Sequence, residues 1–214
     1  MKRIAIFGGS FDPVHLGHLE IIKAVDLYAN PDLILAVPCG NPPHRTRAYA
    51  DAKHRLNMLN LACETLAPSL AAQLQIDDRE LVSDATSYSY HTLKAIAQEN
   101  PNCQLLMAIG WDSLQTFTSW HRWQEILSLT SILVVARRNT GVAQLMDLPA
   151  EIQEVGETQV LNSVENGVIY QLPFAEVDIS STDTRAAIAK SATSEKFIAA
   201  PVADYIKQNK LYRG

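Results

Sequence analysis

The sequence predicts an α/β fold: one domain over residues 1–214, built on a Rossmann-like, doubly wound parallel sheet with helices on both faces. Two observations lead to this prediction. Short, continuous apolar segments alternate along the chain with segments whose apolar residues recur at helical spacing. Strands of a parallel sheet are apolar throughout because helices cover both faces. Right-handed crossovers then distribute the helices over the two sides of the sheet.

Each element follows from a local pattern. The strands are apolar runs bounded by glycine, proline or polar residues, and the helices carry apolar stripes and stop at prolines. The first helix has Leu19, Ile22 and Val25 on one side and ends at Asn30-Pro31. We expect strands at residues 4–7, 33–37, 74–82, 105–109, 132–136 and 167–172, of which 74–82 has the weakest pattern. We expect helices at 19–29, 56–66, 88–100, parts of 111–129, 181–192 and 202–208.

The remaining segments are polar or irregular. Residues 139–166 are interpreted as a variable excursion with a short helix, and the helices after about residue 181 are expected to pack on the same sheet. The carboxyl ends of parallel strands lie along one edge of the sheet, where ligands bind. Almost every strand is followed by an unusual polar stretch, at residues 8–18, 38–45, 83–89, 110–123 and 137–141. The sequence therefore predicts that its chemistry gathers on one rim.

The composition narrows the class of protein. The net charge of −5 argues against general binding to nucleic acid or to an anionic membrane surface, which favours a basic protein. The three cysteines are widely spaced, which is typical of free thiols in a reducing compartment rather than of a disulfide framework or a metal site. The first residues lack a signal-peptide pattern, so we expect a cytoplasmic protein, and a homo-oligomer is compatible with the sequence.

The most informative stretch is Gly8-Gly9-Ser10-Phe11-Asp12-Pro13-Val14-His15-Leu16-Gly17-His18, which lies between the first strand and the first helix. Glycines allow a sharp turn and a close backbone approach, and a helix start offers free N–H groups and a positive dipole end. These features favour phosphate binding. If the helix begins near Leu16, His15 and His18 lie on one face and point at that phosphate. The alternative is an ordinary strand–turn–helix with surface histidines.

A second stretch, Ile179-Ser180-Ser181-Thr182-Asp183-Thr184-Arg185, also precedes a helix. Serine and threonine there are good N-caps, and the helix start again favours anions. Arg185 lies about one turn in and could form a forked contact with a phosphate. The alternative is a capped helix with a surface arginine.

Together the two stretches resemble the GGxFxPxHxGH and ISSTxIR motifs of the nucleotidyltransferases that carry HxGH, with Thr184 in place of an apolar residue. The resemblance implies catalytic roles for His15, His18 and Arg185. It implies ATP binding by Gly8, Gly9, Ser10, Phe11, His15, Gly17, His18, Gly110, Asp112, Ile179, Ser180, Ser181, Thr182 and Arg185.

Further segments resemble bacterial nicotinate-nucleotide adenylyltransferases over nearly the whole chain. They are Pro42-Pro43-His44-Arg45, Ser87-Tyr88-Ser89 with Thr92-Leu93, Gly110-Trp111-Asp112-Ser113-Leu114, Trp120-His121-Arg122-Trp123, and Val202-Ala203-Asp204-Tyr205-Ile206 with Leu211-Tyr212. Ser83 and Thr86 depart from the family pattern, which has arginine and proline there. The resemblance implies mononucleotide binding by Ser10, Pro43, His44, Arg45, Ser87, Tyr88, Ser89 and Trp120.

Some of these residues have two interpretations from the sequence alone. Asp112 could accept hydrogen bonds from ribose hydroxyls or cap a helix. Trp120 and Trp123 lie three apart on a predicted helix, and we expect Trp120 to stack on a pyridine ring and Trp123 to pack in the core. Tyr88 is similarly ambiguous. His44 and Arg45 could hold a phosphate tail or form a solvated basic loop.

The implied reaction joins ATP and nicotinate mononucleotide to give deamido-NAD and pyrophosphate. No nucleophile–base constellation is evident in the sequence, which suits a phosphate transfer driven by positioning and charge neutralisation. Mg²⁺ is expected to bridge ATP phosphates without dedicated protein ligands, since Mg²⁺ keeps its waters. A covalent histidyl-nucleotide on His18 is the other mechanism. The alternatives in function are a nicotinamide mononucleotide substrate, or a non-catalytic nucleotide-binding module on the same fold.

Overall fold

Seven parallel strands form the central sheet, in the order β3-β2-β1-β4-β5-β7-β6. The computed structural model describes residues 1–41, 48–83, 85–135, 152–156, 160–161, 165–173, 179–190 and 196–213. The strands are β1 (Lys2–Gly9), β2 (Leu33–Pro38), β3 (Gln73–Ile76), β4 (Cys103–Gly110), β5 (Ser131–Val135), β6 (Ile152–Glu154) and β7 (Ile169–Leu172). The helices are α1 (Leu16–Ala29), α2 (Ala52–Leu66), α3 (Ser89–Glu99), α4 (Trp111–Gln115), α5 (Trp123–Leu129), α6 (Ser181–Ala189) and α7 (Ala200–Gln208), with short 3₁₀ turns at Ala67–Ser69 and Phe117–Ser119.

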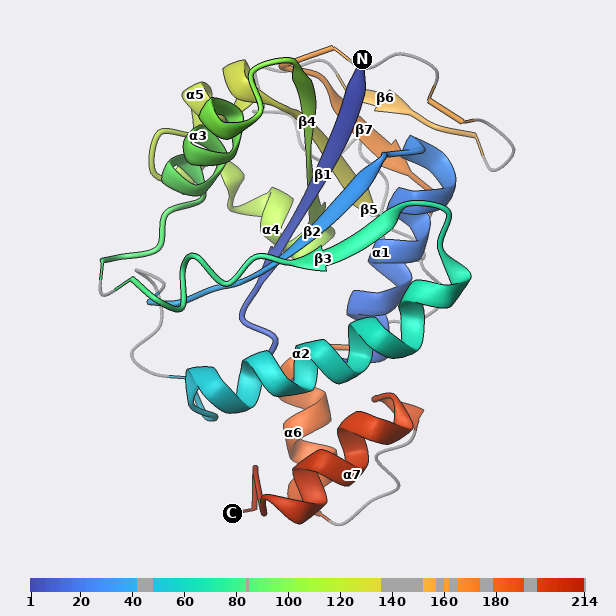
Figure 1. The fold of residues 1–214 in the computed structure, drawn as a ribbon, viewed down its shortest axis with the longest axis vertical. Coiled ribbons are helices and arrows are strands. Elements are labelled where there is room, and N and C mark those ends of the chain that lie inside the picture. Colours follow the sequence, from blue (N-terminus) through green and yellow to red (C-terminus); the bar gives the residue numbers. More distant parts are fainter. Residues whose placement is uncertain are drawn as a thin grey trace.

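The chain winds to one side of β1 through β2 and β3, and then crosses to the other side through β4 and β5. The direction therefore reverses between β1 and β4, which lie at the centre of the sheet (Figure 1). In open parallel sheets, ligands bind at such a reversal, in the crevice beyond the carboxyl ends of the strands. The predicted Rossmann-like fold is confirmed.

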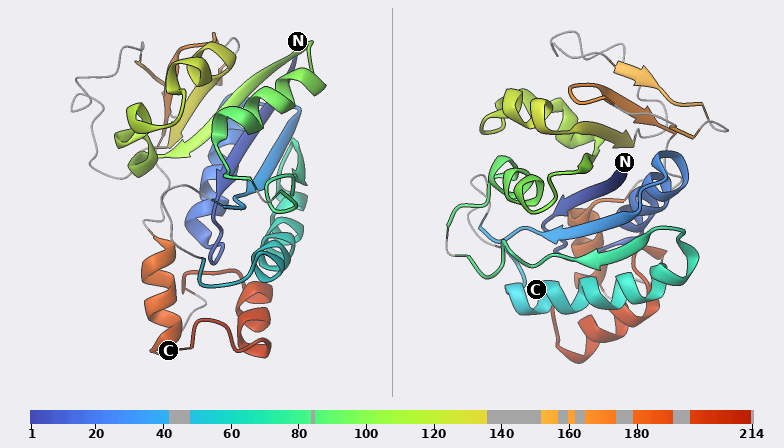
Figure 2. Two further views of the ribbon diagram at one scale, coloured as in Figure 1. Left: turned by 90° about the vertical axis from the view of Figure 1, so that its left-hand side faces the viewer. Right: turned by 45° about the horizontal axis from the view of Figure 1, so that its top comes forward.

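Alternating residues of β1 pack into two separate layers. Ala5 and Phe7 belong to the layer that contains α1, α2 and the C-terminal helix α7, whereas Ile4 and Ile6 belong to the layer with α3, α4 and α5. Because both faces of the strand are buried, β1 is apolar on both, as expected for a central parallel strand. The two views of Figure 2 show helices on the two sides of the sheet.

α7 forms an additional layer. It packs against α2 and lies below that helix in Figure 1. Val202 and Ile206 of α7 are buried in this contact layer. We expected the last helices to pack on the sheet, but α7 packs on α2.

Three expectations about secondary structure were wrong in part. The strand expected at 74–82 ends at Ile76, because the chain turns where the Asp77 side chain accepts the Arg79 amide. The expected excursion at 139–166 contains a strand, β6, that was not expected and that pairs with β7; the short helix expected in this segment stays untested, because most of the segment lies outside the described residues. Trp120 and Trp123 do not share a helix, since α5 begins only at Trp123, after Arg122 in a left-handed conformation (φ 57°).

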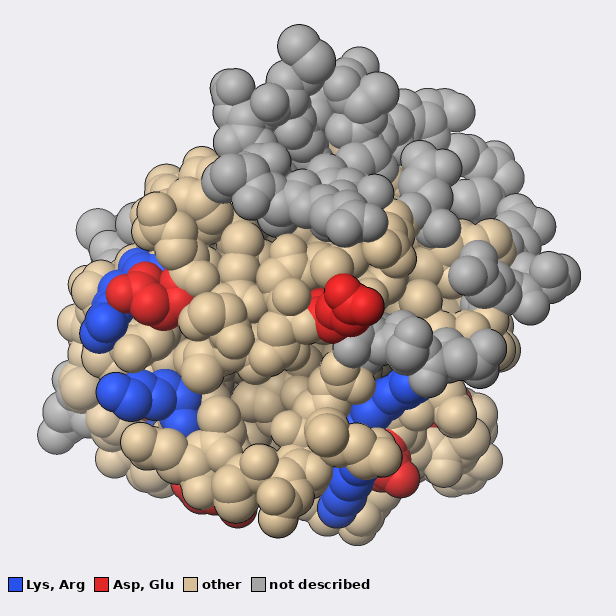
Figure 3. Space-filling view, turned by 90° about the horizontal axis from the view of Figure 1, so that it is seen from above, with Lys and Arg blue, Asp and Glu red and all other residues tan. Residues whose placement is uncertain are grey.

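The surface carries charges of both signs. On the face drawn in Figure 3, acidic and basic side chains lie in small groups between uncharged residues, and neither sign forms a continuous patch among the described residues. None of the described helices has the length and apolar character needed to cross a membrane.

Candidate active site

A cavity of about 480 Å³ lies at the carboxyl edge of the sheet, beyond the ends of β1, β2, β4 and β5. Its volume is in the range of small-molecule sites. Most of the residues predicted from the two motifs and the later segments are in its wall. These are Gly8, Gly9, Ser10, His15, Gly17, His18, Ser87, Ser89, Gly110, Asp112, Trp120, Ile179, Ser180, Ser181 and Thr182.

His15 and His18 lie together at the start of α1. Their rings stack with centroids 3.7 Å apart, and the His15 amide donates to Nδ1 of His18 at 3.2 Å. Because Nδ1 of His18 accepts a hydrogen bond, the neutral ring carries its proton on Nε2. Burial, and next the charge of His15, hold the pKa of His18 well below its usual value. His18 is therefore a neutral ring with one N–H left to donate.

Gly17 and Phe11 hold this histidine pair in place. A Cβ on Gly17 would lie 3.1 Å from the His15 ring and 3.2 Å from the Ile179 carbonyl oxygen, so a larger residue would displace one of them. Phe11 is fully buried, and its ring packs edge-on against His18 with centroids 5.0 Å apart. Phe11 thus packs against His18 and is not among the residues of the cavity wall, and its contact with ATP stays a prediction.

The second motif meets the first through the start of α6. Ser180 caps this helix, because its Oγ accepts the Asp183 amide at 3.1 Å. The Ser181 hydroxyl donates to the Pro13 carbonyl at 3.2 Å. Thr184 is fully buried and its hydroxyl donates to the Ser180 carbonyl at 2.8 Å, so its departure from the family's apolar residue is accommodated inside the helix.

Arg185 supports the first motif but is not in the cavity wall. Its guanidinium donates to the Asp12 carbonyl at 2.7 Å and to the Thr182 hydroxyl at 3.2 Å. It also lies over the exposed ring of Tyr49, with Cζ 4.1 Å from the ring centroid. The guanidinium therefore contacts the backbone of the first motif, and its forked contact with a phosphate stays a prediction.

Asp12 is the centre of a buried polar network that fixes the turn after β1. Its carboxylate is 1% exposed and accepts hydrogen bonds from the Tyr49 amide (2.7 Å), the Ala50 amide (3.1 Å) and the Tyr212 hydroxyl (2.7 Å). Burial, followed by Asp12, raises the pKa of Tyr212 strongly. Since buried carboxylates need such donors, the network joins segments far apart in the chain to the motif.

The cavity wall also contains Ser87, Ser89 and Trp120 from the later segments. The Trp120 ring packs on Phe117, with centroids 5.5 Å apart, and also borders the cavity. Trp123 contacts the same phenylalanine at 6.2 Å and packs with the core layer, in agreement with the interpretation that one tryptophan faces the cavity and the other anchors the core. Tyr88 is not in the wall, and its ring packs on His121 at 4.4 Å.

Asp112 is not a helix cap. Gly110 is the N-cap of α4, and Asp112 lies in the first turn of that helix, exposed and in the cavity wall. The structure therefore excludes the interpretation of Asp112 as a helix cap.

Some residues could not be compared, and others were not predicted. Pro43, His44 and Arg45 lie outside the described residues. The sequence analysis did not identify Cys39, Glu80, Trp111 and Ser113, which are in the cavity wall. Trp111 and Ser113 lie within a quoted motif and Cys39 follows a strand, so a rule based on position could have found them. Glu80 carried no such signal.

The described residues contain no group of three or more histidine, cysteine, aspartate or glutamate side chains that could hold a metal ion. The expectation that Mg²⁺ is bridged by ATP phosphates without dedicated protein ligands stays a prediction.

Known proteins with similar sequences support the same interpretation of the motifs. Residues 6–187 match the family described as cytidylyltransferase-like. A protein of Pseudoalteromonas atlantica named "Probable nicotinate-nucleotide adenylyltransferase" is 36% identical over 98% of this chain and 94% of its own length. A Pseudomonas entomophila protein with the same name is 34% identical over 100% of this chain and 96% of its own.

This chain belongs to the nicotinate-nucleotide adenylyltransferase family. The resemblance drawn from the motifs is thereby confirmed. The fold is also that of a solved Plasmodium falciparum nicotinic acid mononucleotide adenylyltransferase complexed with NaAD, with a TM-score of 0.77, 20% identity, and coverage of 99% of this chain and 98% of the other.

Proposed function

We propose that this protein transfers the adenylyl group of ATP to nicotinate mononucleotide, which yields deamido-NAD and pyrophosphate. The observation that carries the proposal is the stacked His15–His18 pair after β1, with a neutral His18, in the wall of a cavity that also contains Trp120. One side of this cavity offers donors for phosphate, and the other offers an aromatic face and small polar residues for a pyridine ring.

In this reaction an oxygen of the mononucleotide phosphate attacks the α-phosphorus of ATP in line. The new P–O bond forms as the bond between the α-phosphorus and the bridging oxygen breaks, and pyrophosphate leaves with that electron pair. Nε2–H of His18 donates to an α-phosphate oxygen as negative charge develops around it. Since the His18 ring is held by stacking on His15 and by the hydrogen bond from the His15 backbone amide to its Nδ1, the donor is in place before the reaction.

We assign the start of α6 to binding the β- and γ-phosphates of ATP, which leave as pyrophosphate. Ser180, Ser181 and Thr182 lie in the wall at the N-terminal end of this helix, where amide groups and the helix dipole favour anions. Arg185 lies one turn further and is joined to Thr182, so a change of side-chain rotamer would bring its guanidinium to the phosphates. Mg²⁺ enters with ATP as part of the substrate, and it neutralises phosphate charge.

We assign the mononucleotide to the part of the cavity near Trp120 and the Ser87–Ser89 segment. Trp120 supplies a face for the pyridine ring, and the backbone near Tyr88 and Ser89 supplies N–H donors for its carboxylate. Asp112, exposed in the wall, is an acceptor suited to ribose hydroxyls. His44, Arg45 and Pro43 remain proposed for the same substrate on the resemblance alone.

The proposed partners are two small molecules, ATP and nicotinate mononucleotide. The three cysteines are free thiols, which suits a reducing compartment such as the cytoplasm.

The test is pyrophosphate release from ATP, with nicotinate and nicotinamide mononucleotides compared at matched ATP and Mg²⁺. Backbone donors favour an acceptor-only carboxylate, whereas an amide turns its NH₂ against one of them. We therefore expect kcat/KM to be higher for the nicotinate form by about tenfold to a hundredfold. A ratio at or below one would assign the nicotinamide substrate instead, and no release with either would reject the transfer.

A further inference from the structure

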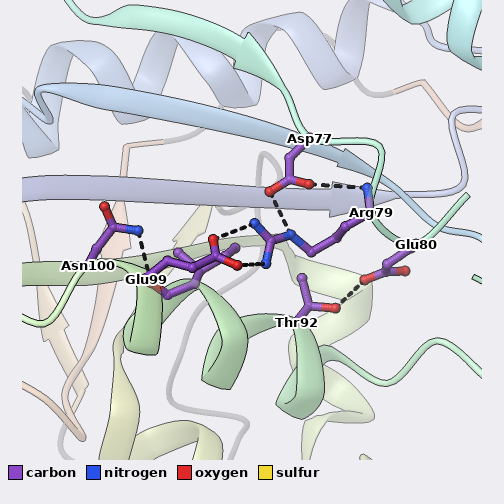
Figure 4. Close-up of polar contacts among 7 residues, drawn as sticks. Asp77, Arg79, Glu80, Thr92, Glu99 and Asn100 are labelled. Atoms are coloured by element: carbon purple, nitrogen blue, oxygen red, sulfur yellow. Dashed lines mark hydrogen bonds and ion pairs between the residues drawn. The ribbon is translucent and has the colours of Figure 1, made fainter. Parts of the chain in front are cut away.

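The turn after β3 is held to both ends of α3. The Arg79 guanidinium contacts Asp77 through Nε at 2.7 Å and forms a forked pair with Glu99 at 3.0 and 2.8 Å. One residue later, Glu80 Oε1 accepts the Thr92 hydroxyl at 2.6 Å. Figure 4 shows the two contacts side by side, with Arg79 directed to the end of α3 and Glu80 to its beginning. The turn therefore cannot move without α3.

Glu80 also touches the segment that follows β2. A Cβ on Gly40 would lie 1.9 Å from the Glu80 carbonyl oxygen, so the two backbones are in direct contact. The Glu80 carboxylate lies close to the Cys39 thiol, whose pKa is raised to about 12 by burial and, next, by this charge. Cys39 and Glu80 are both in the cavity wall.

The same loop is joined to the Ser87 segment by two hydrogen bonds. The Ser87 amide donates to the Asn41 carbonyl at 2.9 Å, and the Asn41 amide donates to the Ser87 hydroxyl at 3.1 Å. Glu80, Cys39 and Ser87 therefore belong to one rigid part of the wall, on the side assigned to the mononucleotide.

This arrangement places the Glu80 carboxylate beside the site proposed for the carboxylate of nicotinate mononucleotide. Like charges close together in a site of low dielectric repel strongly. Thr92 is 8% exposed, and its hydroxyl donates to one oxygen of Glu80, which directs that oxygen toward α3. Without this donor the carboxylate keeps its contact with the Cys39 thiol, which lies in the cavity wall, and is no longer drawn toward α3.

We propose that Thr92 and Glu80 form a positioning pair that sets the preference for nicotinate over nicotinamide mononucleotide. Thr92 holds the Glu80 carboxylate on the α3 side, so that Glu80 braces the Cys39–Asn41 and Ser87–Ser89 segments without facing the substrate's negative charge. Neither residue touches the reacting atoms. The inference rests on the proposed function, because it concerns the mononucleotide half of the same cavity.

The test measures Kd for the two mononucleotides by quenching of tryptophan fluorescence, together with kcat/KM. Thr92→Val removes the hydroxyl with little change in shape, and we expect binding of the nicotinate form to weaken about tenfold while that of the nicotinamide form changes by less than about threefold. KM for ATP should not change. Thr92→Ser keeps the donor and should restore the wild-type ratio of the two Kd values.

Glu80→Gln in the Thr92→Val background separates positioning from loss of packing. If the unrestrained charge causes the defect, the neutral side chain should restore binding of the nicotinate form to within about threefold of wild type. Glu99→Gln is the matched control, because it breaks the exposed contact of the same turn, where the Glu99 side chain is 57% exposed. It should leave the ratio unchanged.

An unchanged Kd ratio in Thr92→Val, or a defect that Glu80→Gln does not correct, would overturn the inference. Failure of the proposed function has a different signature, namely binding by the wild-type protein without pyrophosphate release. Wild-type protein that binds neither mononucleotide would overturn both.

Discussion

Replacing His18 with asparagine removes one donor from the cavity and keeps the hydrogen bond at the start of α1. The asparagine carbonyl can accept the His15 amide, as Nδ1 of His18 does at 3.2 Å. Its shorter side chain ends before the position of Nε2, so the N–H assigned to the α-phosphate is lost. The fold should be preserved, because Phe7 and Phe11, which neighbour the His18 ring, are themselves buried in the core.

The magnitude follows from how firmly the ring is held. His18 lies against His15 at 3.7 Å, Phe11 at 5.0 Å and Phe7 at 5.9 Å between centroids, so its N–H is fixed before the substrate binds. Loss of one such donor lowers the rate by ~10²–10³, equivalent to ~2.7–4 kcal/mol of transition-state stabilisation. We expect this loss in kcat, with KM for ATP changed little, because the interaction strengthens as charge develops.

The assay is pyrophosphate release at saturating substrates, with thermal unfolding to verify the fold. His54→Asn is the control, since His54 Nδ1 contacts the Tyr205 hydroxyl at 2.9 Å away from the cavity wall, and it should lower the Tm without changing kcat. Because the pKa of His18 is lowered well below 6.5, the wild-type kcat should not show a His18 titration between pH 6.5 and 8. A kcat of His18→Asn within about threefold of wild type would refute the assignment.

Further variants test the other assignments. Arg185→Lys should raise KM for ATP more than KM for the mononucleotide, because an ammonium cannot form the guanidinium's forked contact; equal KM values would limit Arg185 to its bond with the Asp12 carbonyl. Trp120→Ala should raise KM for the mononucleotide far more than KM for ATP, and the reverse order would move the pyridine site. Tyr212→Phe leaves the buried Asp12 carboxylate with one donor fewer and should lower the free energy of unfolding in urea by ~1–3 kcal/mol. Burial, and next Glu64, raise the pKa of Cys63 to about 12, so the unfolded state loses this proton first and stability should fall as the pH rises from about 9 to 12, less steeply in Cys63→Ala.

Local patterns predicted the elements and the edge at which the site lies. A run such as Ile4–Phe7, apolar on both faces, is compatible only with a strand covered on both sides, and the alternation of such runs with helices leads to a parallel sheet. Once the sheet is parallel, the segments after β1 and β4 must meet at its carboxyl edge. The stacking of His15 and His18 is also local, because both residues lie at the start of one helix.

The tertiary structure alone decided which distant side chains meet. Arg185 contacts the backbone of Asp12, and Tyr212 contacts its carboxylate, across most of the length of the chain. Glu80 lies in the cavity wall, and its turn is tied to α3 through Thr92. Periodicity and capping act over one or two turns of helix, whereas these contacts depend on how the layers pack. The sequence by itself thus determined where the chemistry gathers, and the packing of the layers determined which residues brace it.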